Sequence, residues 1–372
     1  MDNTASLVVL NMVPRVGSVK TRLLIQHFGS PGKVLEASVS QLERVHGISD
    51  KIAQGIVGWR NTVQIDDELE KVAKAGLNLV TIIDDDYPVN LKEIYDPPIV
   101  LYVKGKLEEQ DKYSIALVGS RRASVYGREM AKKLSYQVAR NSFTVVSGLA
   151  HGIDTAAHRG ALQAGGRTIA VIGSGFNKPY PPDSVEMFDQ IAEQGAVVSE
   201  FPMDMHPDRI NFPMRNRIIS GLSLGVVVVE APQQSGALIT ADHALGQNRL
   251  VFAVPGRCDA PGFKGNHKLI KQGAKLVESV EDILEEFDYL FPQKEVIKGK
   301  FDMEEVKHPD LNEAERKVFS ALDTEEKYID DIMIESGLSP TEVSAILLQL
   351  EMKRLARQLP GKLFVRSNLY QA

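Results

Sequence analysis

The sequence predicts an α/β protein with a doubly wound, mostly parallel sheet, an N-terminal helical domain and a C-terminal winged-helix domain. Three short apolar runs rich in β-branched residues start at Ile115, Phe143 and Arg167, and each ends in glycine and small polar residues. Helical patterns follow the first two runs, up to Arg140 and from Asp154 onward. This alternation is typical of βαβ units, whose parallel strands are buried on both faces.

Composition sets broad limits on the function. The 372 residues suggest two or three domains, and 43% hydrophobic with 25% charged residues is ordinary for a globular protein. A net charge of −6 argues weakly against a protein that coats itself in nucleic acid, although a local basic groove matters more than the total. The single cysteine, Cys258, excludes a disulfide framework and a Cys-rich zinc module, and it fits a reducing cytoplasm. The apolar runs are too short to cross a bilayer, and the start lacks the basic region of a signal peptide. We therefore expect a cytoplasmic protein without a membrane partner.

Residues 1–75 are expected to form a helical domain. Two pieces, 13–28 and 45–57, each place an apolar–glycine turn before a helix, as in a helix-hairpin-helix or SAM-like domain. Such turns can offer backbone amides to a DNA phosphate without reading sequence. A packing domain that binds nothing stays open as the alternative.

Residues 76–289 are expected to form the sheet domain. Further strands are predicted at 77–83, 99–105, 196–200, 224–230, 250–254 and 274–277, with helices at 184–194, 214–222, 237–247 and 280–287. Residues 290–308 are polar and poorly periodic, which indicates a linker. In 309–372, three helices and a hairpin around Pro360-Gly361 describe a winged helix. Its third helix has little basic character, so protein contact or packing is favoured over reading of a DNA groove.

Glycine-rich turns follow the three strands of the central unit. In a parallel sheet the carboxyl ends of the strands line the ligand crevice, and turn amides there form an anion site. Arg121 adds a planar, permanently charged fork that suits a phosphate. The sequence therefore predicts a phosphate-bearing ligand on three turns, which contain Gly119, Ser120 and Arg121; Ser147 and Gly148; and Gly173, Ser174 and Gly175.

Two residues after the third turn extend this prediction. Phe176 is either a core residue or, if exposed, an aromatic side chain that stacks on a base. Lys178 is a plausible point charge for a nucleic-acid backbone.

The segment 214–222 carries two arginines near its start. Arg215 and Arg217 are two residues apart, so they point to different sides of a helix. We expect one of them to contact the ligand and the other to pair with Glu200 or Glu230. Asn216 is expected to cap or to bridge between them.

Several enzymatic interpretations fit poorly. Ser147, His151 and Asp154 suggest a hydrolase, but the Gly-x-Ser-x-Gly elbow is missing and all three lie on one short stretch. Asp154 is more simply the N-cap of a helix that begins at Thr155. Gly119-Ser-Arg-Arg is not a dinucleotide fingerprint, no Walker motif occurs, and His151 and His158 show no metal-ligand spacing with a carboxylate partner. We expect no catalytic residue, no cofactor and no metal.

The chain resembles the DNA processing protein A family, also called Smf, over essentially its whole length. The resemblance lies in the order and spacing of Tyr87-Pro88, Pro97-Pro98, Gly119-Ser-Arg121, Ser147–Asp154, Tyr180-Pro181, Phe212–Gly221 and Ser235–Thr240. It implies an extended Rossmann-like domain that binds and protects single-stranded DNA. It also implies a homodimer through that domain and loading of the RecA recombinase during natural transformation. One departure is Phe176-Asn177, where many members have Leu-Asp.

The hypothesis is that single-stranded DNA crosses the crevice with its phosphates on the three turns, without readout of sequence. An alternative is an enzyme, because a related Rossmann-like family cleaves the glycosidic bond of nucleoside monophosphates. That family uses a Pro-Gly-Gly-x-Gly-Thr loop, whereas this chain has Ala231-Pro-Gln-Gln-Ser-Gly-Ala237. Glu200 or Glu230 could still supply a carboxylate.

Overall fold

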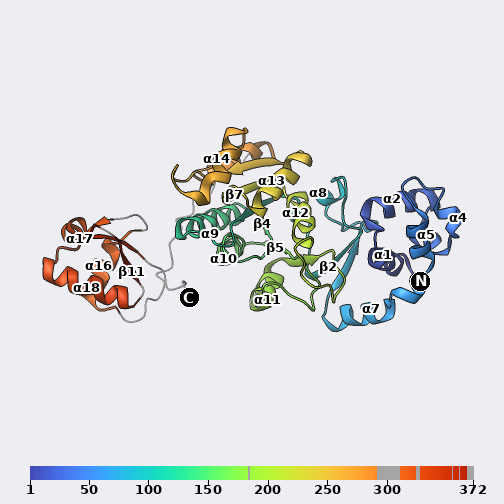
Figure 1. Ribbon diagram of the computed structural model, residues 1–372, viewed down its shortest axis with the longest axis horizontal. Coiled ribbons are helices and arrows are strands. Elements are labelled where there is room, and N and C mark those ends of the chain that lie inside the picture. Colours follow the sequence, from blue (N-terminus) through green and yellow to red (C-terminus); the bar gives the residue numbers. More distant parts are fainter. Residues whose placement is uncertain (183–184, 291–310, 324–326, 354, 360, 367–372) are drawn as a thin grey trace. The chain divides into compact units, whose positions relative to one another are not determined.

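The computed structural model describes residues 1–182, 185–290, 311–323, 327–353, 355–359 and 361–366 (Figure 1). The chain divides into two compact units, Met1–Gly299 and Lys300–Ala372, and each is described by itself. The predicted linker, 290–308, lies outside the described residues except for its first residue.

The first unit begins with a bundle of short helices. They are α1 (Asn3–Met12), α2 (Gly17–Phe28), α3 (Pro31–Glu36), α4 (Val39–Leu42), α5 (Asp50–Val57), α6 (Trp59–Thr62) and α7 (Ile65–Lys74). Side chains start several of these helices: Asp2 accepts a hydrogen bond from the Ala5 amide, and Ser30 accepts one from the Lys33 amide. Leu7, Leu24 and Ile56 are fully buried in a core that also includes strand β2 (Val100–Gly105), so the bundle packs directly on the sheet.

The described residues of this unit form a sheet of nine strands in the order β1-β2-β6-β5-β4-β3-β7-β8-β9 (Figure 1). From β6 to β9 all neighbours are parallel, whereas β1 and β2 are antiparallel, which confirms a mostly parallel sheet. The remaining strands are β1 (Asn78–Thr81), β3 (Ser114–Gly119), β4 (Thr144–Ser147), β5 (Thr168–Val171), β6 (Ala196–Ser199), β7 (Gly225–Glu230), β8 (Leu250–Ala253) and β9 (Lys275–Leu276).

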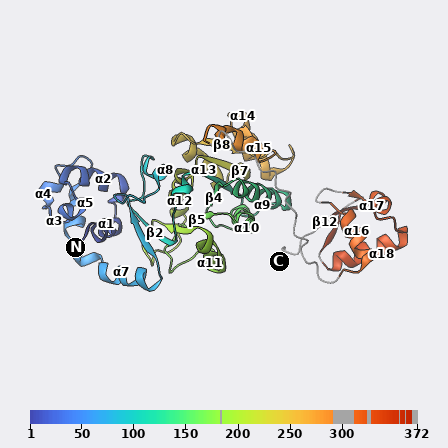
Figure 2. The ribbon, with the colours of Figure 1, turned by 180° about the vertical axis from the view of Figure 1, so that it is seen from behind.

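Helices cover both faces of the sheet. On β3, Ile115 and Leu117 belong to the core with α9 (Val125–Arg140) and α10 (Ile153–Gln163), which lie side by side (Figure 2). Ala116 and Val118 point to the other face and belong to the core with α12 (Asn211–Leu222) and α13 (Gly236–Gly246). The strand is therefore buried on both faces, as the continuous apolar run predicts.

Smaller elements complete this unit. They are α8 (Val89–Lys92), α11 (Val185–Gln194), α14 (Lys264–Lys271), α15 (Glu281–Leu284) and the 3₁₀ turns η1 (Glu109–Lys112), η3 (Pro261–Phe263) and η4 (Glu285–Leu290). Helix α12 begins at Asn211 rather than at Met214, because Pro213 fits in a first helical turn, where its missing N–H costs nothing.

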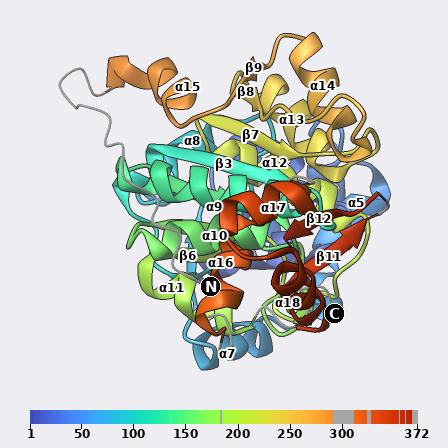
Figure 3. The same ribbon diagram turned by 90° about the vertical axis from the view of Figure 1, so that its left-hand side faces the viewer.

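The chain reverses its direction of winding at β3. From β3 it proceeds through β4, β5 and β6 on one side, and then returns to place β7 on the other side of β3. Figure 3 shows β7 next to β3. In open α/β sheets, ligands bind outside the carboxyl ends of the strands at such a reversal. The fold therefore predicts a ligand site at the carboxyl ends of β3 and β7.

The second unit has a core of its own. It contains α16 (Glu313–Ala321), β10 (Lys327–Tyr328), α17 (Ile329–Ser336), α18 (Pro340–Met352), β11 (Ala356–Leu359) and β12 (Leu363–Arg366), with the described strands in the order β10-β12-β11. Helix α18 starts with a capping box of Ser339 and Glu342, and α17 ends at Gly337 in the left-handed conformation. This arrangement confirms the predicted winged helix.

Candidate nucleic-acid interface

A cavity of about 700 Å³ lies at the reversal point between β3 and β7. Its walls come from the turn after β3, the first turns of α12 and α13, and η3. Of the predicted site residues, it is lined by Gly119, Ser120, Arg121, Arg215 and Asn216.

The turn after β3 is held by close backbone contacts. The Ser120 amide donates to the Glu230 carbonyl at 2.7 Å, and the Ser120 carbonyl accepts from the Ile153 amide at 3.2 Å. A Cβ on Gly119 would lie 2.8 Å from the Glu230 carbonyl oxygen and 2.5 Å from the Ile153 side chain. Glycine is therefore required at 119 by packing, and the turn is held rigidly at the mouth of the cavity.

Arg121 is exposed at this mouth. Its guanidinium lies 4.7 Å from the ring centroid of Phe212 and 5.8 Å from that of Tyr180, and the two rings are themselves 5.4 Å apart. It forms no ion pair with any described residue, so cation–π contacts position its side chain. The guanidinium is thus placed next to an aromatic surface with its charge available to a ligand.

Arg215 is the buried partner of Arg121, with 4% of its surface exposed. A Cβ on Gly148 would lie 1.6 Å from Nη1 of Arg215, so this glycine leaves the space that the guanidinium occupies. Its Nε has no hydrogen-bond partner within the described part of the chain. Burial lowers the pKa of Arg215 to about 10, opposed by nearby Asp154 and reinforced by Arg121. A buried guanidinium without hydrogen-bond partners costs free energy of folding. A phosphate between the two arginines would accept hydrogen bonds from both guanidinia.

Asp154 connects the first two turns. Its carboxylate accepts hydrogen bonds from the Gly119 amide and, at 3.4 Å, from the Ala150 amide. Burial raises the pKa of Asp154, and Arg215 opposes that rise. Because α10 begins at Ile153 with Gly152 as N-cap, the predicted N-cap role of Asp154 is wrong. The carboxylate instead fixes two turns and faces the buried guanidinium.

Ser147 does not face the cavity. Its hydroxyl donates to the Leu117 carbonyl at 2.6 Å, and the side chain is fully buried between β4 and β3. The second turn therefore acts through Gly148, which makes room for Arg215.

The third turn is covered, contrary to the expectation that all three turns lie on one rim. The Gly175 amide donates to the Met205 carbonyl and the Asn177 amide to the Met203 carbonyl, both at 2.9 Å. A Cβ on Gly173 would lie 2.9 Å from the Phe212 ring, and one on Gly175 would lie 2.1 Å from the Pro202 carbonyl oxygen. These glycines therefore admit the segment before α12 rather than an anion, and Ser174 is buried with them.

Phe176 and Lys178 also lie outside the cavity lining. Phe176 packs edge-on against Phe188, with ring centroids 6.2 Å apart, and contacts two apolar cores. The core alternative therefore describes Phe176 better than the stacking alternative. Lys178 is half-buried and lies near Asp204, whose pKa is lowered chiefly by the Lys71 and Asn177 hydrogen bonds and slightly by Lys178.

Arg217 and Asn216 have structural partners. Arg217 pairs with Glu200 at 2.6 Å and with Asp96 at 2.9 Å, which confirms that one arginine of this helix pairs with Glu200. Asn216 donates to the Gly236 carbonyl at 3.2 Å and so ties α12 to α13, instead of bridging the two arginines. Of the two arginines, Arg215 is therefore the one that lines the cavity.

Several residues in the cavity lining or at its mouth are not among the predicted site residues. Tyr180 and Phe212 belong to the motifs of the family resemblance, but no aromatic role was assigned to them. Ser235-Gly236 starts a helix after a buried strand, and this was a usable signal, because such a turn faces the same rim. Arg209 also lines the cavity, and nothing in the surrounding sequence marks it.

Glu230 occupies the place where a dinucleotide phosphate would bind. Its two carboxylate oxygens each accept the Ser124 amide at 3.0 Å, at the N-terminus of α9, and one also accepts the Ser124 hydroxyl. This is the helix N-terminus that follows the first strand of the unit, where anions bind in dinucleotide-binding sheets. With Glu200 paired to Arg217, both carboxylates considered for an enzyme are engaged in structural contacts.

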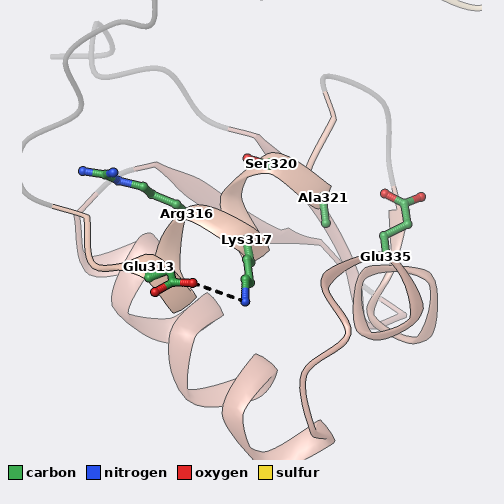
Figure 4. A pocket seen from close by; sticks show the side chains of 6 residues that line it. All are labelled: Glu313, Arg316, Lys317, Ser320, Ala321 and Glu335. Atoms are coloured by element: carbon green, nitrogen blue, oxygen red, sulfur yellow. Dashed lines mark ion pairs between the residues drawn. The ribbon is translucent and has the colours of Figure 1, made fainter.

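The second unit has a shallow hollow of about 390 Å³ between α16 and α17 (Figure 4). Its charged groups are largely paired: Lys317 with Glu313 at 3.6 Å, and Glu335 with Lys327 at 2.7 Å. It has no unsatisfied buried group comparable to Arg215, so it carries no site. Among the described residues, no helix is long and apolar enough to cross a membrane, and no cluster of three metal-ligating side chains occurs.

Comparison with known proteins shows the family and the fold of the chain. Residues 78–288 match the family model of DNA recombination-mediator protein A, residues 304–362 match the DprA winged helix domain, and residues 8–67 match the helix-hairpin-helix motif. Protein Smf of Synechocystis sp. is 36% identical, over 96% of this chain and 97% of its own length. DNA processing protein DprA of Bacillus subtilis is 46% identical, over 57% of this chain and 71% of its own length.

Two solved structures extend the comparison. The X-ray structure of DprA from Streptococcus pneumoniae is similar with a TM-score of 0.68 and 36% identity, covering 77% of this chain and 98% of that one. A structure of DprA from Helicobacter pylori, described as giving insight into its single-stranded DNA binding mode, has a TM-score of 0.51 and 26% identity, over 56% of this chain and 95% of that one. The extended Rossmann-like fold is thereby shared, and the chain belongs to the DNA recombination-mediator protein A family.

Proposed function

We propose that this protein binds single-stranded DNA at the β3–β7 cavity without reading its sequence. The observation that carries the proposal is the pair of guanidinia, one exposed at the mouth and one buried without a hydrogen-bond partner. A backbone phosphate between Arg121 and Arg215 would separate two like charges and complete the hydrogen bonding of the buried one. The Helicobacter pylori relative, whose structure is described in terms of single-stranded DNA binding, supports the same ligand class.

Aromatic side chains beside Arg121 support a single strand over a duplex. Phe212 and Tyr180 form a partly exposed surface at the mouth, where unstacked bases can stack. Stacking tolerates any base because every base offers a π-face, and phosphate contacts carry no sequence information. Arg209 adds a further exposed cation along the strand.

Family membership supports a wider role. We propose that the protein protects incoming single-stranded DNA and loads the RecA recombinase on it during natural transformation, acting as a homodimer through the sheet domain. A dimer would join two cavities and raise avidity through effective concentration. This work would take place in the cytoplasm, where the exposed thiol of Cys258 stays reduced.

The terminal regions are given supporting roles in this proposal. Helix α18 has no Lys or Arg between Pro340 and Met352, so it lacks the cationic side chains that neutralise DNA phosphates. We propose that the winged helix contacts protein. We propose that the N-terminal bundle serves mainly to pack against β2.

Binding of the full-length protein to single-stranded and double-stranded oligonucleotides, over a series of salt concentrations, tests the proposal. Single strands should bind more tightly, and log K should fall with log salt with a slope of about −0.7 for each phosphate neutralised. Equal affinity for duplex, or binding that does not depend on salt, would contradict it. Release of free base from a nucleoside monophosphate would favour the glycosidic enzyme instead.

A further inference from the structure

The helical bundle at the N-terminus holds a segment of the sheet domain. This segment, residues 200–205, runs from the end of β6 toward α12. Three bundle side chains, one on α1 and two on α7, bind it through polar contacts. These contacts are Asn11 Nδ2 to the Glu200 carbonyl at 2.9 Å, the Met203 amide to Glu68 Oε1 at 2.8 Å, and Lys71 to Asp204 at 2.5 Å. Met203 is also fully buried in the core of the bundle, so the segment is held by packing as well as by hydrogen bonds.

Glu68 makes the strongest of these contacts. Only 3% of its surface is exposed, and the Met203 amide that donates to it is buried as well. A hydrogen bond to a carboxylate is stronger than one between neutral groups, and low-dielectric surroundings strengthen it further. Burying a carboxylate costs free energy unless it is hydrogen-bonded, and the Met203 amide offsets part of that cost. The pair of Lys71 with Asp204 is more exposed and contributes little.

The same segment supports the helix that forms one wall of the cavity. The Glu200 carboxylate pairs with Arg217 of α12 at 2.6 Å, and both side chains are largely buried. Helix α12 carries Arg215, which lines the cavity, and Phe212, whose ring lies beside the guanidinium of Arg121. The positions of Arg215 and Phe212 therefore depend on where the 200–205 segment lies.

We propose that Glu68 is a positioning residue for DNA binding: through the 200–205 segment it holds α12 so that Phe212 and Arg215 face the strand. This inference rests on the proposed function and gives the N-terminal bundle a part in it without any contact between the bundle and DNA. Coupling of this kind is carried by contiguous packed and hydrogen-bonded groups, and it is reciprocal. Binding of a strand should therefore also stabilise the hydrogen bond between the Met203 amide and Glu68.

The first test compares two substitutions of Glu68 in the full-length protein, at a temperature well below the unfolding of either variant. Glu68→Leu removes the acceptor, whereas the side-chain carbonyl of Glu68→Gln can still accept from the Met203 amide. Glu68→Leu should weaken binding of a dT oligonucleotide about fivefold, and Glu68→Gln should restore most of the affinity. The salt slope should stay the same in both variants, because no phosphate contact is lost.

Glu70→Ala is the matched control. Glu70 lies on the same helix, is exposed, and pairs with Lys74 within that helix at 2.7 Å. Its removal should leave the affinity unchanged. If Glu68→Leu does not fold, Asn11→Ala serves the same purpose, because it removes the donor to the Glu200 carbonyl at the other end of the segment. This variant should weaken binding at least about twofold.

The second test measures the reciprocal effect by hydrogen exchange. Saturation with the dT oligonucleotide should slow exchange of the Met203 amide about fivefold in the unaltered protein and in Glu68→Gln, but not in Glu68→Leu. The buried Ile52 amide, which donates to the Ser49 carbonyl in another part of the bundle, is the internal control and should exchange at the same rate with and without DNA. A purely structural role of Glu68 would lower the free energy of unfolding without making exchange at Met203 depend on DNA.

The possible outcomes separate this inference from the proposed function. Unaltered affinity in both Glu68→Leu and Asn11→Ala, no recovery in Glu68→Gln, or an equal loss in Glu70→Ala overturns the positioning role. A smaller salt slope in Glu68→Leu would mean that the bundle itself contacts a phosphate, and equal slowing of exchange at Ile52 would mean general stabilisation. Either result also overturns the positioning role while single-strand binding stands. Failure of the unaltered protein to bind the oligonucleotide would sink the proposed function itself.

Discussion

The turns after β3 and after β5 are alike in sequence but have opposite surroundings. Gly119-Ser-Arg121 lines the cavity and ends in an exposed guanidinium, whereas Gly173-Ser-Gly175 lies under the segment that leads into α12. Both sets of glycines are required because another group approaches the backbone closely. At the first turn those groups are the Ile153 side chain and the end of β7, and at the third they are the backbone of Pro202 and Met203 together with the Phe212 ring. A glycine-rich turn thus indicates that another group lies close to its backbone. The surrounding residues decide whether that group is a ligand or part of the protein.

At neutral pH, the largest effect on stability is expected from adding a methyl group to the covered turn. A Cβ at 175 would meet two carbonyl oxygens, at 2.1 and 2.3 Å, and backbone atoms cannot move aside as a flexible side chain can. Gly175→Ala should therefore lower the free energy of unfolding by about 3 kcal/mol, near the upper end for overpacking. Urea denaturation measures this change, and Gly246→Ala, which fills open space, is the control. Normal stability of Gly175→Ala would show that the third turn is not tightly covered.

A substitution in the turn after β3 should change DNA binding rather than the free energy of unfolding. Arg121→Ala should weaken single-stranded DNA binding about tenfold on all sequences and reduce the salt slope by about 0.7, because one phosphate contact is lost. A salt titration by fluorescence anisotropy measures both quantities. Arg140→Ala removes another exposed charge, at the far end of α9 and outside the cavity lining, and should leave both unchanged. An unaltered salt slope in Arg121→Ala would show that Arg121 does not contact a phosphate of the bound DNA.

The contrast between the turns explains how far the sequence could predict the site. Burial of the β3 run on both faces and the winged helix follow from local pattern, and the pairing of one of Arg215 and Arg217 with Glu200 or Glu230 follows from charge, although the sequence does not say which arginine or which carboxylate. The burial of the third turn does not, because it depends on residues 202–212, which are distant in sequence and have no regular periodicity. For the same reason Phe176 cannot be assigned to the core from its position beside a glycine, and Arg209 cannot be placed at the cavity. Long-range packing decides these cases.

The turn after β4 lies between these two cases, because it contributes to the cavity only by making room for the buried Arg215. His158, on the helix behind it, has its pKa lowered from 6.5 to about 3 by burial and, secondarily, by Arg215. The Thr168 hydroxyl donates to the Val145 carbonyl, so Nδ1–H of His158 donates to that hydroxyl. Below pH 6.5 the unfolded chain binds a proton that the folded chain does not, so stability falls as the pH decreases toward 3.

His158→Leu should make this acid sensitivity smaller. Between pH 6.5 and about 3 the unaltered protein should lose up to about 1.4 kcal/mol more per pH unit than the variant. Urea unfolding at a series of pH values measures the two slopes. Parallel slopes would mean that His158 titrates normally in the folded protein.

The smallest effect is expected at Lys178, and it tests the comparison most directly. Lys178 follows the covered turn, lies near Asp204 and is not among the cavity-lining residues, so its charge reaches the strand only across solvent. At physiological salt such a charge is screened over about 8 Å, and Lys178→Ala should change single-stranded DNA affinity by less than about twofold. The same salt titration as for Arg121→Ala gives the answer. A loss of affinity as large as that of Arg121→Ala, with a similar change of the salt slope, would show that the DNA contacts the third turn. Only direct neutralisation of a phosphate changes the salt slope by that amount.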